Sequence, residues 1–123
     1  DVTIVAVGYM VYRAVEAAKK LAAEGIECEI VDPRTIVPLD KKTILDSVRK
    51  TGRLVVVTES VGTYGVAAEI AAMVGEDGLF ELDAPVRRVC AKNSPIPFAP
   101  CCEADVLPST DNIVRAVKEI CGR

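Results

Sequence analysis

The side chains that most often perform chemistry in enzymes are scarce in this sequence. None of its 123 residues is histidine, which removes the commonest general base, the commonest zinc ligand and every Ser-His or Cys-His nucleophile pair. The five cysteines are odd in number and include no CxxC pair; they are Cys28, Cys90, Cys101, Cys102 and Cys121. Because disulfide frameworks need paired thiols and thiolate metal sites usually need four ligands, we interpret them as reduced thiols. The sequence therefore predicts no catalytic and no metal-binding residue in this chain.

Glycine-bearing turns are the next candidates for ligand binding. After the first apolar run, Gly8 supplies only one of the three glycines of a GxGxxG dinucleotide fingerprint, and no GxxxxGK[ST] phosphate loop occurs. A second turn precedes a stretch of small residues with helical spacing, where backbone amides can hold an anion. This candidate anion loop comprises Gly62, Thr63, Tyr64 and Gly65. The alternative, which we favour, is that its glycines simply allow a tight turn and close packing.

Charged residues follow two of the expected strands at their carboxyl ends, where α/β sheets usually place functional groups. Asp32 and Arg34 come after the second strand and Glu59 comes after the third. Such a cluster can bind a ligand, or it can be an ion-pair network that holds loops or a neighbouring domain. We favour a structural polar cluster with a buried Arg34, because no base, nucleophile or metal ligand accompanies these residues.

The hydrophobic periodicity indicates which elements must position these groups. Continuous or alternating apolar runs predict strands over 2–8, 26–31, 53–58 and 86–90, and helical spacing predicts helices over 10–24, 40–51, 64–74 and 109–121. Asp40 and Ser109 are expected N-caps, and a proline-rich loop follows the fourth strand. Strands that alternate with helices predict a single α/β domain over 1–123, with helices on both faces of a parallel sheet.

Charge and hydropathy exclude two classes of partner. The net charge is −3 and no basic patch stands out in the sequence, which argues against nucleic acid. No apolar run approaches the roughly 18 residues that a membrane span needs, so we expect no membrane contact. The reduced thiols make a cytoplasmic protein the expectation. The chain begins at Asp1 directly before a strand-like run. We therefore expect a piece of a longer protein, cut at a domain boundary.

Several stretches also resemble a known family along the whole chain. They are DVTIVAVGYMV in 1–11, EGIECEIVDPRTIVPLD in 24–40, KTGRLVVVTES in 50–60, GVAAEIA in 65–71, LDAPVRRV in 82–89 and the proline-rich segment through 108. Together they resemble the C-terminal domain of transketolase-like enzymes, above all the beta subunits of thiamine-diphosphate-dependent 2-oxo-acid and acetoin dehydrogenases. Deoxyxylulose-phosphate synthases share a looser version. The chain departs from the family at Tyr12, where histidine is common, at Gly62-Thr63, where the family has a longer glycine pair, and at Cys101-Cys102.

The resemblance implies a three-layer α/β/α sandwich with a five-stranded, mainly parallel sheet. The residues indicate only four strands, and the fifth has candidates around 36–39 and in the proline-rich loop. In the family, thiamine diphosphate and magnesium belong to the parent enzyme, and the activating glutamate and catalytic histidine lie in a preceding domain. The resemblance therefore implies no cofactor in this domain and no catalysis in isolation.

The resemblance also implies a role in assembly and docking. The expected partners are a second beta subunit, an alpha subunit and the subunit-binding module of a dihydrolipoyl acyltransferase. A negative surface suits a basic docking module, and Asp83, Glu103 and Asp105 are the candidate docking residues. Two alternatives stay open. One is the C-terminal domain of a transketolase or deoxyxylulose-phosphate synthase, and the other is an independent anion- or nucleotide-binding α/β domain.

Overall fold

Four parallel strands form the central layer of the computed structural model, which describes residues 1–122. The strands are β1 (Val2–Ala6), β2 (Cys28–Val31), β3 (Leu54–Val61) and β4 (Arg87–Ala91). Their order across the sheet is β2-β1-β3-β4, so the chain starts in the middle, moves to one edge and then crosses to the other. The predicted parallel α/β sheet is confirmed.

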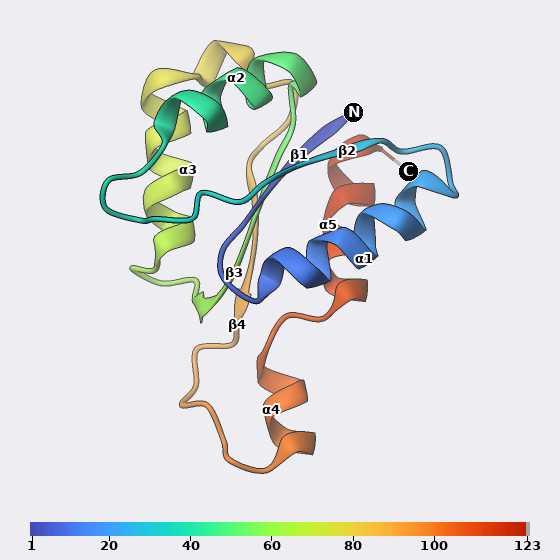
Figure 1. The fold of residues 1–123 in the computed structure, drawn as a ribbon, viewed down its shortest axis with the longest axis vertical. Helices are drawn as coiled ribbons and strands as arrows, with labels where there is room; N and C mark the ends of the chain where they lie inside the picture. Colours follow the sequence, from blue (N-terminus) through green and yellow to red (C-terminus); the bar gives the residue numbers. More distant parts are fainter. Residues whose placement is uncertain (123) are drawn as a thin grey trace.

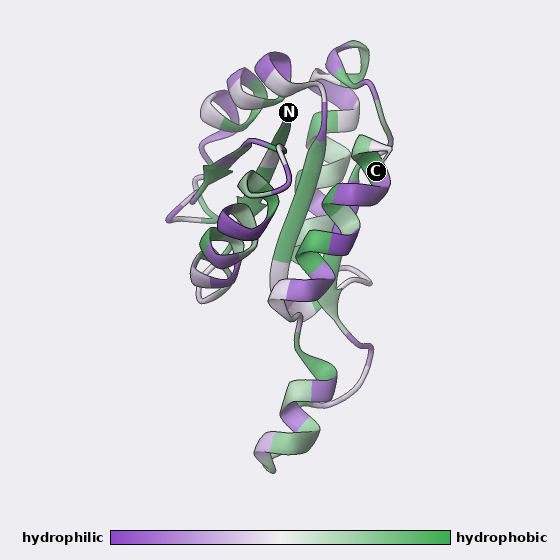
Figure 2. Ribbon diagram, turned by 90° about the vertical axis from the view of Figure 1, so that its right-hand side faces the viewer, coloured by the Kyte–Doolittle hydropathy of each residue, from purple (hydrophilic) through white to green (hydrophobic). Residues whose placement is uncertain are grey.

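Helices cover both faces of this sheet (Figure 1). On one face lie α1 (Met10–Ala22) and α5 (Thr110–Cys121), and on the other lie α2 (Lys41–Thr51) and α3 (Val66–Asp77), followed by the short 3-10 helix η1 (Leu79–Glu81). Figure 2 shows the resulting layers, with hydrophobic strands inside and hydrophilic helix surfaces outside. The three-layer arrangement follows because the central strands β1 and β3 are apolar on both sides, and the helices that cover them each bury one apolar stripe.

Successive residues of the central strands pack alternately into two hydrophobic cores, one on each face of the sheet. Ile4 and Val55 pack toward α1 and α5, whereas Val5 and Val56 pack toward α2 and α3; all four are fully buried. Their alternation is the period of two that an extended chain imposes. A continuous run of valines therefore gives a strand that is covered on both faces.

The predicted helix boundaries rest on local hydrogen bonds. The Asp40 side chain accepts a bond from the Thr43 amide at 3.1 Å, which caps α2. Ser109 and Asn112 form a reciprocal capping box at the start of α5. At its other end, α2 stops at Gly52, whose φ of 69° lies in the left-handed region. These short-range signals are readable in the sequence.

Two expectations about the fold differ from the structure. The described residues contain four strands, not five: residues 36–39 form a turn with a cis Val37–Pro38 bond, and the proline-rich segment forms no strand. That segment instead leads into an unexpected helix, α4 (Pro100–Val106), which projects from the body (Figures 1 and 2). Pro100 is compatible with this helix because it stands in the first turn, where no backbone donor is needed. No helix within 1–122 is long and apolar enough to cross a membrane.

Candidate functional site

The polar cluster expected at the carboxyl edge is divided in the structure. Arg34 Nη1 lies 3.3 Å from Asp32 Oδ2, and the Arg34 amide donates to Asp32 Oδ1 at 3.1 Å. The Arg34 side chain is 84% exposed, so the prediction of a buried arginine is wrong. Glu59 lies apart from this pair, in a hollow beside Tyr9 and Arg13. The loop after β2 turns outward at Arg34, whose φ is 61°, and this turn carries the guanidinium into solvent.

The candidate anion loop, Gly62 to Gly65, joins β3 to α3 and is fixed by backbone contacts. Arg88 Nη1 donates a hydrogen bond to the Gly62 carbonyl at 2.7 Å. A Cβ atom on Gly65 would lie 2.2 Å from the Val61 carbonyl oxygen, so only glycine fits there. Tyr64 adopts a φ of 55° and its side chain is fully exposed. These contacts support packing as the reason for the glycine at position 65.

An apolar hollow of about 520 Å³ opens beside this loop. It lies between the segment after β2 and α3, and it is lined mainly by Ile36, Val37, Pro38, Leu39, Tyr64, Val66, Ile70 and Met73. Its charged lining residues are Lys41 and Glu69. Val37 is 90% exposed, and with Tyr64 it leaves large apolar area in contact with water. Exposed apolar area that borders a hollow is typical of protein interfaces.

The three acidic residues expected to form one docking surface lie at opposite ends of the molecule. The Asp83 amide donates to the Gly52 carbonyl at 2.7 Å, which places Asp83 at the amino end of β3. Glu103 and Asp105 belong to α4, which projects beyond the carboxyl end of the sheet (Figure 1). The prediction of a single acidic surface is therefore wrong, because residues 84–99 carry the chain from one end of the sheet to the other.

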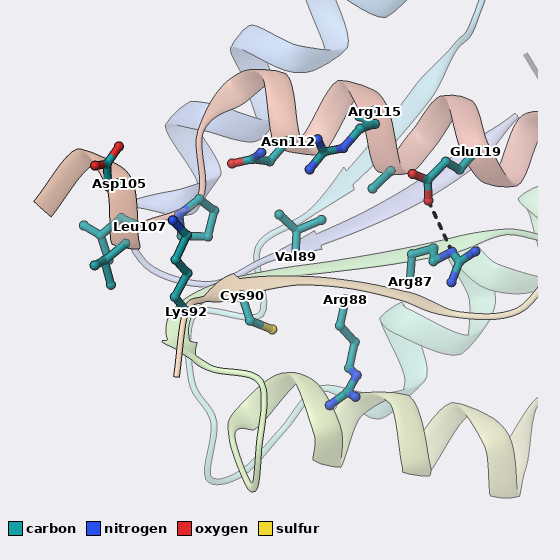
Figure 3. Close-up of a pocket in the computed structure, with 13 residues that line it drawn as sticks. Arg87, Arg88, Val89, Cys90, Lys92, Asp105, Leu107, Asn112, Arg115 and Glu119 are labelled. Atoms are coloured by element: carbon teal, nitrogen blue, oxygen red, sulfur yellow. Dashed lines mark ion pairs between the residues drawn. The ribbon is translucent and has the colours of Figure 1, made fainter. Parts of the chain in front are cut away.

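A further cavity, which the sequence did not reveal, lies between β4 and α5 (Figure 3). Its volume is about 410 Å³, and its lining includes four cationic side chains, Arg87, Arg88, Lys92 and Arg115, against two acidic ones, Asp105 and Glu119. One ion pair crosses it, between Arg87 Nε and Glu119 Oε2 at 3.7 Å. The signal in the sequence was the arginine doublet in VRRVC, which the net charge of −3 obscured.

The cysteines occupy different environments and do not form a common site. Burial raises the pKa of the Cys28 thiol to about 11, and the neighbouring Cys121 adds to the shift. Cys101 and Cys102 are exposed on α4, with 3.9 Å between their sulfur atoms. Among residues 1–122, no group of three or more Cys, Asp or Glu side chains is arranged to hold a metal ion.

Comparisons with known proteins agree with this architecture. The family model described as "Transketolase, C-terminal domain" matches residues 1–113. The chain is 50% identical to pyruvate dehydrogenase E1 component subunit beta-1, mitochondrial, of Arabidopsis thaliana, over all of this chain and 34% of that protein. It is 43% identical to the acetoin:2,6-dichlorophenolindophenol oxidoreductase subunit beta of Bacillus subtilis, over 99% of this chain and 36% of that protein.

A solved structure shows the same fold. The protein titled "Split gene transketolase, inactive beta4 tetramer" superposes with a TM-score of 0.83 at 32% sequence identity, over 98% of this chain and 38% of that one. The four-stranded parallel sheet and its helical layers thus define a transketolase C-terminal-like domain. The chain belongs to the transketolase C-terminal domain family. It spans about a third of the length of the curated relatives it matches.

Proposed function

We propose that this chain is a non-catalytic assembly domain of a thiamine-diphosphate-dependent 2-oxo-acid or acetoin dehydrogenase beta subunit. The observation that carries the proposal is the apolar hollow beside α3, with Val37 and Tyr64 exposed at its rim. An apolar surface of this kind is stabilised when another subunit covers it. The similarity to beta subunits of pyruvate and acetoin oxidoreductases supports the same role.

The proposal assigns the chemistry to other parts of the parent enzyme. Thiamine diphosphate and magnesium would be held by a different domain, and pyruvate or acetoin would react there. The proposed partners are a second beta subunit, an alpha subunit and the subunit-binding module of the acyltransferase. For that last module, Glu103 and Asp105 on α4 are the candidate acidic contacts, since exposed carboxylates suit a basic surface.

Self-association of the chain tests the assembly role. Sedimentation equilibrium over a range of concentrations is expected to show reversible association, and Tyr64→Asp is expected to weaken it by placing a charge in the apolar contact. Phe80→Asp is the matched control, because Phe80 is equally exposed but lies on η1, outside the hollow. Equal effects of the two substitutions, or a strict monomer at all concentrations, would contradict the proposal.

Calorimetry with thiamine diphosphate and magnesium tests the non-catalytic part separately. We expect no measurable heat of binding from this chain. Binding of micromolar strength would show that the domain itself holds the cofactor, whatever its state of association.

A further inference from the structure

The edge strand β4 lacks a neighbour on its outer side within the described chain. It is the last strand of the sheet and pairs only with β3. At an edge, alternate backbone N–H and C=O groups point away from the sheet and are available to another strand. The Lys92 amide donates to the Val106 carbonyl at 3.0 Å, so the chain itself covers this edge beyond the carboxyl end of β4. Arg87 to Ala91 therefore leave an open edge of about 16 Å, at roughly 3.3 Å for each residue.

Hollows flank β4 on both sides. The cavity toward α5 measures about 410 Å³, and a second hollow of about 400 Å³ lies beside Gly62, Val86 and Asn93. Arg87, Arg88 and Cys90 line both. Space above and below a strand edge is what the alternating side chains of an added strand would occupy.

The charges around this edge select the kind of strand that fits. Figure 3 shows Arg87 and Val89 directed toward α5, and Arg88 and Cys90 directed toward α3. Lys92 and Arg115 form no ion pair with any residue in 1–122, and both are exposed. The cavity lining carries an excess of two positive charges, although the whole chain has a net charge of −3. Acidic side chains on both faces of an added strand would therefore meet cationic partners.

The same charges disfavour pairing of two β4 strands. A second copy of β4 would bring another lining with an excess of positive charge against the first, and like charges repel one another. The other edge strand, β2, differs because its Glu29 is paired with Lys50. Cationic residues at an edge thus prevent self-pairing while they attract an acidic strand.

We infer that the open edge of β4 binds an extended acidic segment of a partner protein, which adds to the sheet as a further strand. The backbone of β4 supplies the hydrogen bonds, and Arg87, Arg88, Lys92 and Arg115 select acidic side chains. This surface differs from the apolar hollow beside α3, so it is occupied independently of subunit association.

The probe for this inference is a blocked, fluorescent peptide that repeats two glutamates followed by two valines, which puts glutamates on both faces of an extended strand. We expect it to bind the full chain and to slow hydrogen exchange of the β4 amides. The same peptide with lysine for glutamate is expected not to bind. A third peptide retains the glutamates but replaces the valines with proline, which cannot donate the ladder hydrogen bonds, and it too is expected not to bind.

Two charge-reversal variants locate the contact. Arg115→Glu is expected to weaken binding about two- to thirtyfold, because reversal removes one exposed attraction and adds a comparable repulsion. Lys19→Glu changes the total charge equally, but Lys19 is exposed on α1, outside the cavity, and its effect should stay below about twofold. Thermal melts of both variants confirm that they fold. Equal binding of the proline peptide, equal effects of the two substitutions, or self-association that the peptide displaces would each overturn the inference.

Discussion

A single methyl group added at Gly65 tests why the turn before α3 contains glycine. Its backbone, with φ −87° and ψ 172°, is a conformation that alanine adopts without strain, so any cost must come from contact. The added Cβ would lie 2.2 Å from the Val61 carbonyl oxygen and 3.0 Å from Ser60 Oγ, whereas real Cβ atoms essentially never approach an atom within 3.0 Å. The backbone would therefore have to move by roughly 0.8 Å.

The surroundings resist that movement. Val61 is the last residue of β3 and pairs with Ala91 of β4, and the next carbonyl, that of Gly62, accepts the hydrogen bond from Arg88. Forcing extra atoms into such a fixed contact typically costs about 1–3 kcal/mol. For a domain of this size, 1 kcal/mol corresponds to roughly 3–6 °C in Tm. Gly65→Ala should therefore lower the Tm by about 3–18 °C.

The same substitution elsewhere provides two controls. Gly75 lies within α3 and a Cβ there meets nothing within 4 Å, so Gly75→Ala should raise stability by about 0.5–1 kcal/mol through helix propensity. At Gly62 the added Cβ would make only ordinary contacts, 3.6 Å from Cys90 Cβ, and little change is expected. Thermal and urea melts followed by circular dichroism measure all three. A Gly65→Ala variant as stable as the parent would refute the packing explanation and reopen ligand binding at this loop.

Two further outcomes follow from side-chain environments. Arg34→Ala should lower the Tm by no more than about 6 °C, because one exposed ion pair contributes about 0–1 kcal/mol; a larger fall would mean that the side chain is packed in solution. In alkylation followed by peptide mass spectrometry, Cys101 and Cys102 should react first because they are exposed. The raised pKa of Cys28, about 11 against an ordinary value of 9.0, leaves about a hundredfold less thiolate below pH 9, so its reaction should accelerate only as the pH rises toward 11. Rapid labelling of Cys28 at pH 8 would contradict the burial that causes the shift.

The sequence alone determined the local elements and the class of fold. The uninterrupted apolar residues of β1 and β3 predict that these strands are buried on both faces. Asp40 and Ser109 predict where helices begin, because their side chains accept hydrogen bonds from amides three residues further along the chain. Strand-helix alternation then restricts the topology to a parallel sheet with covered faces. Strands and helix ends can be predicted from the sequence because the residues that determine them lie within a few positions of the element itself. The sequence did not predict helix α4, because the prolines of this segment indicated a rigid loop. Pro100 instead stands in the first turn of the helix, which is the turn that tolerates proline.

Only the tertiary structure decided which charged residues meet. Asp83 and Glu103 are acidic in the sequence alike, but the chain between them runs the length of the sheet and separates them. Arg34 follows a strand as a buried arginine would, but a left-handed backbone turn carries its side chain into solvent. Arg87 and Arg115 show the opposite behaviour, because they are far apart in the sequence but β4 and α5 bring them to one cavity. The net charge of the whole chain gives no indication of this cationic cluster. Interactions between charges depend on their distances in space, and the sequence does not give these distances. The crossovers of the whole chain place β4 at the edge of the sheet, and so they decide which charged residues lie near it.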